Sequence, residues 1–267
     1  MTPAWRLLET GARAGDWNMG CDTALLAAAA AGTIPPTLRF YGWSPPAVSL
    51  GAHQPEPDPA AVAELGARGV TWVRRPTGGR AVWHGPAEAE LTYSVVIPAG
   101  TPRFTGGLTA SYRLIHQALA AGFARLGIDA ELAAPASRRA TSPARASSGP
   151  HSRRACFAAA VPGELTVRGR KLVGSAQRRV RGALLQHGSI PLTGDQAVLA
   201  AAWPNCLSPS GVATVEWAAG RRYSSATVTA AMAAGFAATL GVAFEPGPPP
   251  PGPLDLARAR TICSASP

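Results

Sequence analysis

The sequence predicts a domain of the α+β class, in which strands and helices are mixed. Short runs that alternate apolar with polar residues, concentrated between residues 164 and 192, are typical of strands. Residues 108–126 instead carry apolar side chains three or four positions apart, which is the spacing of an amphipathic helix. No glycine-rich phosphate loop stands between a strand and a helix, which argues against a nucleotide-binding parallel sheet.

The N-terminal half alternates predicted strands with predicted helices. Apolar residues at alternate positions, together with aromatic and β-branched side chains, predict strands at residues 5–10, 38–43, 47–50, 70–75 and 90–97. Alanine-rich or periodic segments predict helices at residues 23–31, 60–68 and 108–126. Gly32 and Gly127 are expected to end the first and the third of these helices.

The C-terminal half is organised around residues 164–192. We predict strands at residues 164–167, 171–173 and 183–190, with turns at Gly169, Gly174 and Gly182. Helices are expected at residues 195–202 and 225–240, the second capped by a serine or threonine and ended by Gly241. Residues 133–154 are rich in Ala, Ser, Pro and Arg without periodicity, and we expect a long mobile loop there.

The chain of 267 residues is long enough for one large domain or two small ones. A run of prolines between residues 247 and 253 cannot enter a helix or a sheet. We therefore expect one folded domain over residues 1–245 and a proline-rich flexible tail over residues 246–267.

Sequence features also bear on the environment of the protein. No apolar run reaches the length of a membrane span, and the N-terminus lacks the basic-then-apolar layout of a secretory signal. We expect no membrane association and a cytoplasmic location. The four cysteines are scattered without the Cys and His spacing of a zinc site, so we expect reduced thiols and no metal.

The formal net charge of +10 has three interpretations. It is compatible with nucleic-acid binding, with a charged surface that has no partner, or with an acidic protein partner. Much of this charge is arginine in predicted loops. We favour an acidic protein partner and expect no nucleic acid.

Two reactive side chains stand close together in sequence. Lys171 is the only lysine, and its ammonium group is a compact point donor where the arginines offer planar guanidinium groups. Cys156 lies upstream in Arg-Arg-Ala-Cys-Phe, after a basic segment. A thiol and an amine so placed suggest covalent acyl chemistry. The alternatives are an inert small apolar side chain for Cys156 and a solvated hairpin lysine for Lys171.

A basic, glycine-rich segment spans residues 74–84, with the sequence RRPTGGRAVWH. The paired glycines Gly78 and Gly79 allow backbone N–H groups to approach a carbonyl or a phosphate closely. Arg74 opens the segment, and His84 ends the short strand that follows it. A simple hairpin turn is the alternative interpretation of the two glycines.

Three stretches in the same order resemble the lipoate/biotin protein ligase and octanoyltransferase superfamily. Residues 40–51 (FYGWSPPAVSLG) resemble its early strand pair, and residues 74–84 resemble its acyl-binding loop. GRKLVGSAQ, followed by LQHGSI, resembles its lysine hairpin. The resemblance implies a mixed, largely antiparallel sheet with flanking helices. It makes residues 1–245 an acyltransferase or ligase catalytic domain.

The superfamily contains two kinds of enzyme. Ligases activate lipoate with ATP and Mg, whereas transferases move an octanoyl group from acyl carrier protein through a cysteine thioester and need no cofactor. Cys156-Phe157 stands where the cysteine-dependent transferases have their motif, and Arg80 replaces a third glycine usual in the ligases. The resemblance therefore favours octanoyl or lipoyl transfer to a lysine of a lipoyl-domain or glycine-cleavage H protein. An ATP-dependent ligase and a non-catalytic acyl-binding or lipoyl-protein-binding member remain alternatives.

The resemblance also implies the site residues. Cys156 would be the nucleophile, and Lys171 the cation that activates it and donates to the acyl carbonyl. The expected substrate-binding residues are Arg74, Gly78, Gly79, His84, Gly174, Ser175, Ala176 and His187. Val82, Leu91, Val173 and Leu185 are candidate walls of an acyl slot, and Cys21, Cys206 and Cys263 are taken as structural.

Overall fold

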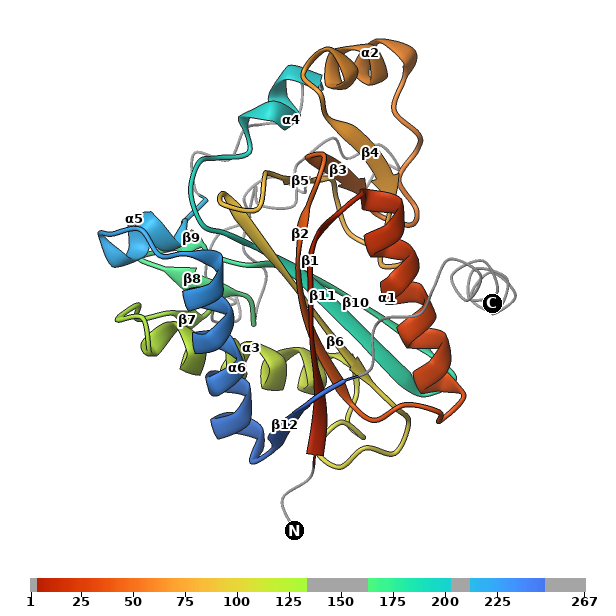
Figure 1. Cartoon of the computed structure of the whole chain (residues 1–267), viewed down its shortest axis with the longest axis vertical. Helices are drawn as coiled ribbons and strands as arrows, with labels where there is room; N and C mark the ends of the chain where they lie inside the picture. Colours follow the sequence, from red (N-terminus) through yellow and green to blue (C-terminus); the bar gives the residue numbers. More distant parts are fainter. Residues whose placement is uncertain (1–3, 134–162, 203–211, 248–267) are drawn as a thin grey trace, which may run out of the picture.

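The structure is a computed structural model that describes residues 4–133, 163–202 and 212–247. Its largest sheet has six strands in the order β10-β11-β6-β2-β1-β12 (Figure 1). These strands are β10 (Gly174–Val180), β11 (Ala183–Pro191), β6 (Glu90–Ile97), β2 (Thr37–Trp43), β1 (Ala4–Arg13) and β12 (Ala243–Pro246). The pairings from β10 to β2 are antiparallel, whereas β1 runs parallel to both β2 and β12. The mixed, largely antiparallel sheet implied by the resemblance is confirmed.

Two smaller sheets flank the large one. In the first, β3 (Ala47–Leu50) lies between β4 (Thr71–Arg74) and β5 (Val82–His84). In the second, β8 (Leu165–Val167) lies between β7 (Glu131–Leu132) and β9 (Arg170–Lys171). Figure 1 shows the first at one end of the large sheet and the second along its side.

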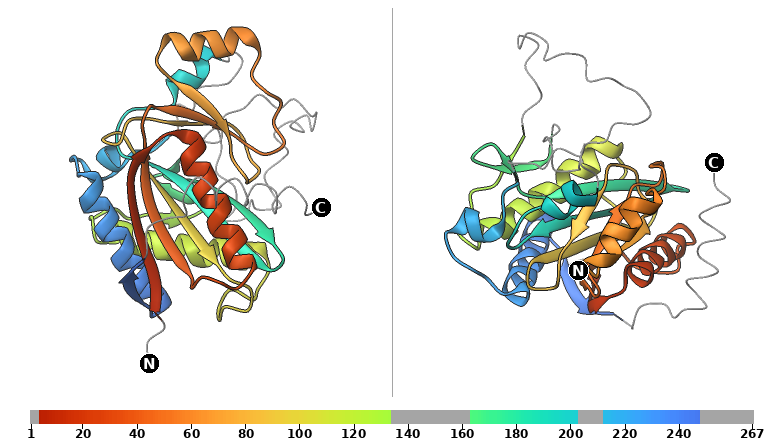
Figure 2. Two further views of the ribbon diagram at one scale, coloured as in Figure 1. Left: turned by 45° about the vertical axis from the view of Figure 1, so that its right-hand side comes forward. Right: turned by 90° about the horizontal axis from the view of Figure 1, so that it is seen from above.

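Helices cover both faces of the large sheet (Figures 1 and 2). α1 (Gly15–Ala30) packs on one face, and α3 (Leu108–Ala124) and α6 (Ser225–Leu240) pack on the other. Because side chains alternate along a strand, adjacent residues of β6 face different layers: Val95 joins the core beneath α3 and α6, and Val96 packs beneath α1. α2 (Pro59–Ala67) and α4 (Ala197–Ala202) pack beside β3, and the short α5 (Val215–Ala219) precedes α6.

Most predicted elements are confirmed within one to three residues at their ends. α6 has the predicted bounds, with the Ser224 side chain accepting from the Thr227 N–H at 3.1 Å and Gly241 ending the helix at φ 66°. The predicted segments at residues 38–43, 47–50 and 90–97 are β2, β3 and β6. Within the described ranges, no helix combines the length and the apolar character that crossing a membrane requires.

Two parts of the prediction were wrong. α1 begins at Gly15 rather than near Thr23, because the side chains of Asn18 and Asp22 are buried against β2 and make the first turns part of the core. β10 was not predicted, because its Ser-Ala-Gln-Arg-Arg run lacks apolar alternation. β10 forms by pairing over its whole length with residues 183–189 of β11, with its other side at the edge of the sheet. The turn predicted at Gly174 is instead the start of β10, and of the strand predicted at residues 171–173 only Lys171 belongs to one, β9. β7, β12 and α5 were also missed.

Several predictions fall on residues that the structure does not describe. The long loop predicted at residues 133–154 lies outside the described residues apart from Ala133. The predicted tail also lies outside them, apart from Pro246, which pairs with Leu7, and Gly247. The boundary between residues 245 and 246 therefore stays a prediction.

Candidate active site

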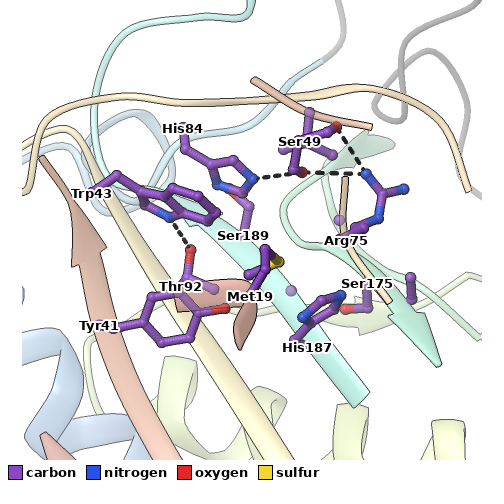
Figure 3. A pocket seen from close by; sticks show the side chains of 14 residues that line it. Met19, Tyr41, Trp43, Ser49, Arg75, His84, Thr92, Ser175, His187 and Ser189 are labelled. Carbon is purple, nitrogen blue, oxygen red and sulfur yellow. Dashed lines mark hydrogen bonds between the residues drawn. The ribbon is translucent and has the colours of Figure 1, made fainter. Parts of the chain in front are cut away.

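A cavity of about 330 Å³, including its open mouth, lies where the β4-β3-β5 sheet meets the large sheet (Figure 3). It is lined from β2, β3, β5, β6, β10 and β11, from α1, and from the segment between β4 and β5. The lining residues are Met19, Tyr41, Trp43, Ser49, Arg75, Val82, His84, Thr92, Gly174, Ser175, Ala176, His187, Gly188 and Ser189.

The lysine hairpin region supplies one wall of this cavity. His187 and Ser189 are two positions apart on β11, so strand alternation turns both side chains to the same face. Gly188 lies between them, and a Cβ there would be 2.6 Å from Tyr93 Cε1 and 2.7 Å from Ser175 Oγ. Only glycine fits this position without moving its neighbours. The Oγ of Ser189 is buried and has no hydrogen-bond partner among the described residues.

Asp22 on α1 is the centre of a buried polar network behind the cavity. Its carboxylate accepts from Arg39 Nη1 at 2.7 Å, from Tyr41 and Ser94 at 2.9 Å each, and from His187 Nδ1 at 2.9 Å. Burial alone would raise the pKa of Asp22, but the charge of Arg39 and the hydrogen bond from His187 outweigh it and lower this pKa. Asp22 is therefore ionised and holds the Nδ1–H of His187.

His187 is thus fixed in orientation and tautomer. With Nδ1 donating to Asp22, the Nε2 atom of a neutral imidazole is the acceptor, and it lies 2.6 Å from Thr77 Oγ1. Thr77 is buried and belongs to the glycine-rich segment. This bond therefore ties the segment to β11.

A second histidine faces the same cavity with a similar set of partners. His84 Nδ1 lies 3.3 Å from Glu90 Oε1, and His84 Nε2 lies 2.8 Å from Ser49 Oγ. The ring of Trp43 stacks on the imidazole, with centroids 4.0 Å apart and planes at 17°. Burial lowers the pKa of His84 despite the opposing effect of Glu90, so the imidazole is neutral at neutral pH.

The glycine-rich segment is shaped by Arg75. Its buried guanidinium donates to the carbonyls of Ser49 at 3.0 Å, Gly78 at 2.8 Å and Arg80 at 2.8 Å. The backbone of the glycine-rich segment also lies directly against Gly51, where a Cβ would be 2.1 Å from the carbonyl oxygen of Gly79. The neighbouring Arg74 does not line the cavity, and it donates to the carbonyls of Gly51 and Gln54 instead.

Lys171 lies next to the cavity but is not among its lining residues. Its ammonium donates to Glu164 Oε1 at 2.7 Å, and both side chains are buried. Leu172 and Val173 connect Lys171 to Gly174, where the lining begins. His116 joins the two regions, with Nδ1 2.6 Å from the Gly163 carbonyl and Nε2 2.9 Å from Ser175 Oγ.

The structure places some of the predicted site residues on the cavity wall and others outside it. His84, Gly174, Ser175, Ala176 and His187 line the cavity. Arg74, Gly78, Gly79 and Lys171 lie beside it, and Cys156 is outside the described residues. Of the candidate acyl walls, Val82 lines the cavity, whereas Leu91, Val173 and Leu185 pack in the core clusters.

Sequence reasoning missed Asp22, Ser49, Arg75, Glu90 and Ser189. The available signal was a lone carboxylate inside an apolar run, as Asp22 is in CDTALLAAAA and Glu90 is at the start of ELTYSVVI. A carboxylate in such a run implies a buried partner. Cys21 is buried, and burial raises the pKa of its thiol to about 11, as suits a structural cysteine. Cys206 and Cys263 lie outside the described residues.

Comparisons with known proteins agree on one family. The family model described as lipoyl protein ligase A/B catalytic domain matches residues 15–237. The octanoyltransferase LipM of Kyrpidia tusciae is 42% identical over 256 residues, covering 91% of this chain and 89% of that protein. The LipM of Symbiobacterium thermophilum is 43% identical over 261 residues, covering 92% and 90%.

A solved structure shares the fold. The crystal structure of lipoate-protein ligase A bound with ATP superposes with a TM-score of 0.71 at 23% identity, covering 99% of this chain and 95% of that one. At this identity the likeness shows the fold alone. This chain therefore has the overall fold of that ligase.

Proposed function

The chain belongs to the lipoyl protein ligase A/B catalytic domain family, and we propose that it is an octanoyltransferase of protein lipoylation. The observation that carries the proposal is the identity of 42% and 43% to two octanoyltransferases across nine tenths of the chain. The donor is octanoyl acyl carrier protein, and the acceptor is a lysine of a lipoyl-domain or glycine-cleavage H protein. The reaction takes place in the cytoplasm and needs no cofactor.

In the first half-reaction the Cys156 thiolate attacks the donor thioester. The new bond joins Sγ to the acyl carbon, and the carrier thiol leaves with a proton. Cys156 is seven residues before Gly163, whose N–H donates to the Ala133 carbonyl at 2.9 Å. Seven residues span at most roughly 25 Å, a length that allows Cys156 to approach the Lys171 region.

Lys171 is well suited to the role of activating cation. A nearby positive charge favours the thiolate form of a cysteine, and an ammonium can also donate to a carbonyl oxygen as charge develops there. The Glu164 carboxylate holds this ammonium in place at 2.7 Å. An octanoyl group has only one polar atom, its carbonyl oxygen, and the unpaired Ser189 Oγ offers that atom a further donor in the cavity.

In the second half-reaction a lysine amine of the acceptor protein attacks the acyl-enzyme. The amine must lose a proton, and a base within hydrogen-bond reach accelerates this step. His84 lines the cavity with a neutral imidazole oriented by Glu90, and it is the base we assign, with Lys171 as the alternative.

Transfer is expected to proceed without ATP. Thioester exchange is nearly neutral in free energy, so octanoyl carrier protein and an apo lipoyl domain should suffice. The measurement is the intact mass of the acceptor, with peptide mapping of its modified lysine, in the presence and absence of ATP and Mg. Strict dependence on ATP would identify a ligase and reject the transferase proposal.

Replacing Lys171 with methionine should lower the rate of transfer by about 10²–10³, the usual effect of removing one preorganised donor. The variant keeps the length of the side chain but lacks the ammonium, and circular dichroism checks that it is folded. Arg170→Met, at the exposed neighbouring position, is the matched control and should change the rate little. A Lys171→Met enzyme as fast as the control would contradict the assigned role.

A further inference from the structure

We propose that Ser49 is a second nucleophile in this cavity and that Ser49, His84 and Glu90 together hydrolyse medium-chain acyl thioesters without Cys156. The reaction uses the acyl cavity of the proposed transferase but none of its cysteine chemistry. The two proposals can therefore fail separately.

The hydrogen bonds among the three residues run from the Ser49 hydroxyl to His84 and from His84 to Glu90. Glu90 Oε1 accepts from Thr92 Oγ1, so His84 Nδ1, which faces the same oxygen at 3.3 Å, carries the ring proton. His84 Nε2 then has a lone pair and accepts the hydroxyl proton of Ser49 at 2.8 Å. Arg75 Nη1 donates to Ser49 Oγ at 3.2 Å, which leaves the hydroxyl proton for His84. This is the connectivity of a nucleophile, a base and an orienting acid.

The surrounding residues hold this arrangement rigidly. Thr92 Oγ1 donates to Glu90 Oε1 at 2.6 Å and accepts from Trp43 Nε1 at 2.8 Å. Trp43 in turn stacks on the His84 ring, so the carboxylate and the imidazole are fixed by the same side chain. Glu90 Oε2 is buried without a partner among the described residues. Within the described part of the chain, only Oε1 of this side chain is therefore engaged, by Thr92 and His84.

The nucleophile faces space where an acyl group can lie. Ser49, His84 and Arg75 line the cavity and are shown together in Figure 3. The Arg75 guanidinium stands next to the attacking Ser49 Oγ, and Ser189 Oγ on the same cavity has no partner among the described residues. The N–H groups of Arg75 already donate to Ser49, Gly78 and Arg80, so Ser189 Oγ is the donor we assign to the oxygen of a tetrahedral intermediate.

Atoms and protons balance in the reaction. Ser49 Oγ attacks the thioester carbon and gives its proton to His84 Nε2; the C–S bond breaks, and the thiol leaves with that proton. Water then attacks the seryl ester, again giving a proton to His84 Nε2. The C–O bond to Ser49 breaks, the proton returns to Oγ, and the carboxylic acid is released. Water is the only co-reactant.

The other serine with a histidine partner is a weaker candidate. Ser175 Oγ lies 2.9 Å from His116 Nε2, but His116 Nδ1 faces the carbonyl of Gly163 rather than a carboxylate. A carboxylate partner is what distinguishes Ser49.

The test measures hydrolysis in a Cys156→Ala background. The full chain with this substitution is incubated with octanoyl-N-acetylcysteamine, and release of the thiol is compared with the uncatalysed rate. We expect hydrolysis above background, and a loss of at least ~10²-fold when Ser49→Ala is added. Hydrolysis that needs Cys156, or that is unchanged by Ser49→Ala, overturns the proposal. A wild-type enzyme that does not transfer octanoate to the acceptor protein would instead count against the proposed function.

Covalent labelling gives a second readout that does not depend on a substitution at the buried Ser49. An octyl fluorophosphonate reacts with an activated serine, and peptide mass spectrometry identifies the labelled residue. Label on Ser49 of the Cys156→Ala chain, reduced by His84→Gln, supports the proposal; label only on Ser175, or none, overturns it. Ser111→Ala removes a buried hydroxyl of α3 outside the cavity and should leave the labelling of Ser49 unchanged.

Discussion

Replacing Cys156 with serine should lower the rate of octanoyl transfer by about 10⁴-fold or more, because a hydroxyl at neutral pH is far less nucleophilic than a thiolate. The proposed mechanism routes the acyl group through this sulfur. Acyl carrier protein that carries octanoate should therefore leave an acyl adduct on wild-type enzyme and none on the variant.

Intact mass spectrometry before the acceptor is added checks this outcome, and peptide mapping locates the adduct. Cys263→Ser is the matched control, since it removes another thiol of the chain that the mechanism does not use. It should keep both the adduct and the transfer rate. Full-rate transfer by Cys156→Ser would rule out the covalent route and leave direct transfer or an ATP-driven reaction.

Replacing Asp22 with alanine should destabilise the protein by about 3–5 kcal/mol, the usual cost of leaving a buried charge without its partner. The side chains of Asp22 and Arg39 are both fully buried. Without the carboxylate, Arg39, Tyr41 and His187 each lose a hydrogen-bond acceptor. In a domain of this size the melting temperature should fall by roughly 6–20 °C.

Glu64→Ala is the control for an exposed ion pair. Glu64 and Arg68 form a pair on α2 whose side chains are 41% and 50% exposed, and its loss should cost at most about 0.5 kcal/mol. Urea unfolding of both variants measures the difference. A cost for Asp22→Ala as small as that for Glu64→Ala would show that the network does not support the fold. Because Asp22 also orients His187, activity should be compared only at temperatures where the variant is folded.

Elements with a strong periodic pattern could be predicted from the sequence, and elements without one could not. α3 begins at the predicted Leu108, because its buried Ile115, Leu119 and Phe123 recur at helical spacing, and β6 has the predicted bounds because its apolar and β-branched run is long and continuous. β10 carries a polar run and forms because β11 offers it a partner along its length. The first turns of α1 are helical because their polar side chains have buried partners on β2.

The candidate site was predicted only where a motif marks it. His84, Gly174, Ser175, Ala176 and His187 belong to recognisable motifs and line the cavity. Asp22 was missed because its partner His187 is 165 residues away, and Ser49 because His84 is 35 residues away. A contact between such distant residues leaves no local pattern in the chain.

The amino-acid sequence determined the family, the mixture of strands and helices, and the presence of a lone lysine and a thiol, since these depend on residue identity and short-range spacing. Only the tertiary structure decided that two histidines share one cavity, and that a carboxylate and a hydroxyl flank each of them. The physical reason is that these side chains meet through the pairing of strands distant in sequence. Their burial removes them from water, so most of their polar atoms are paired within the protein.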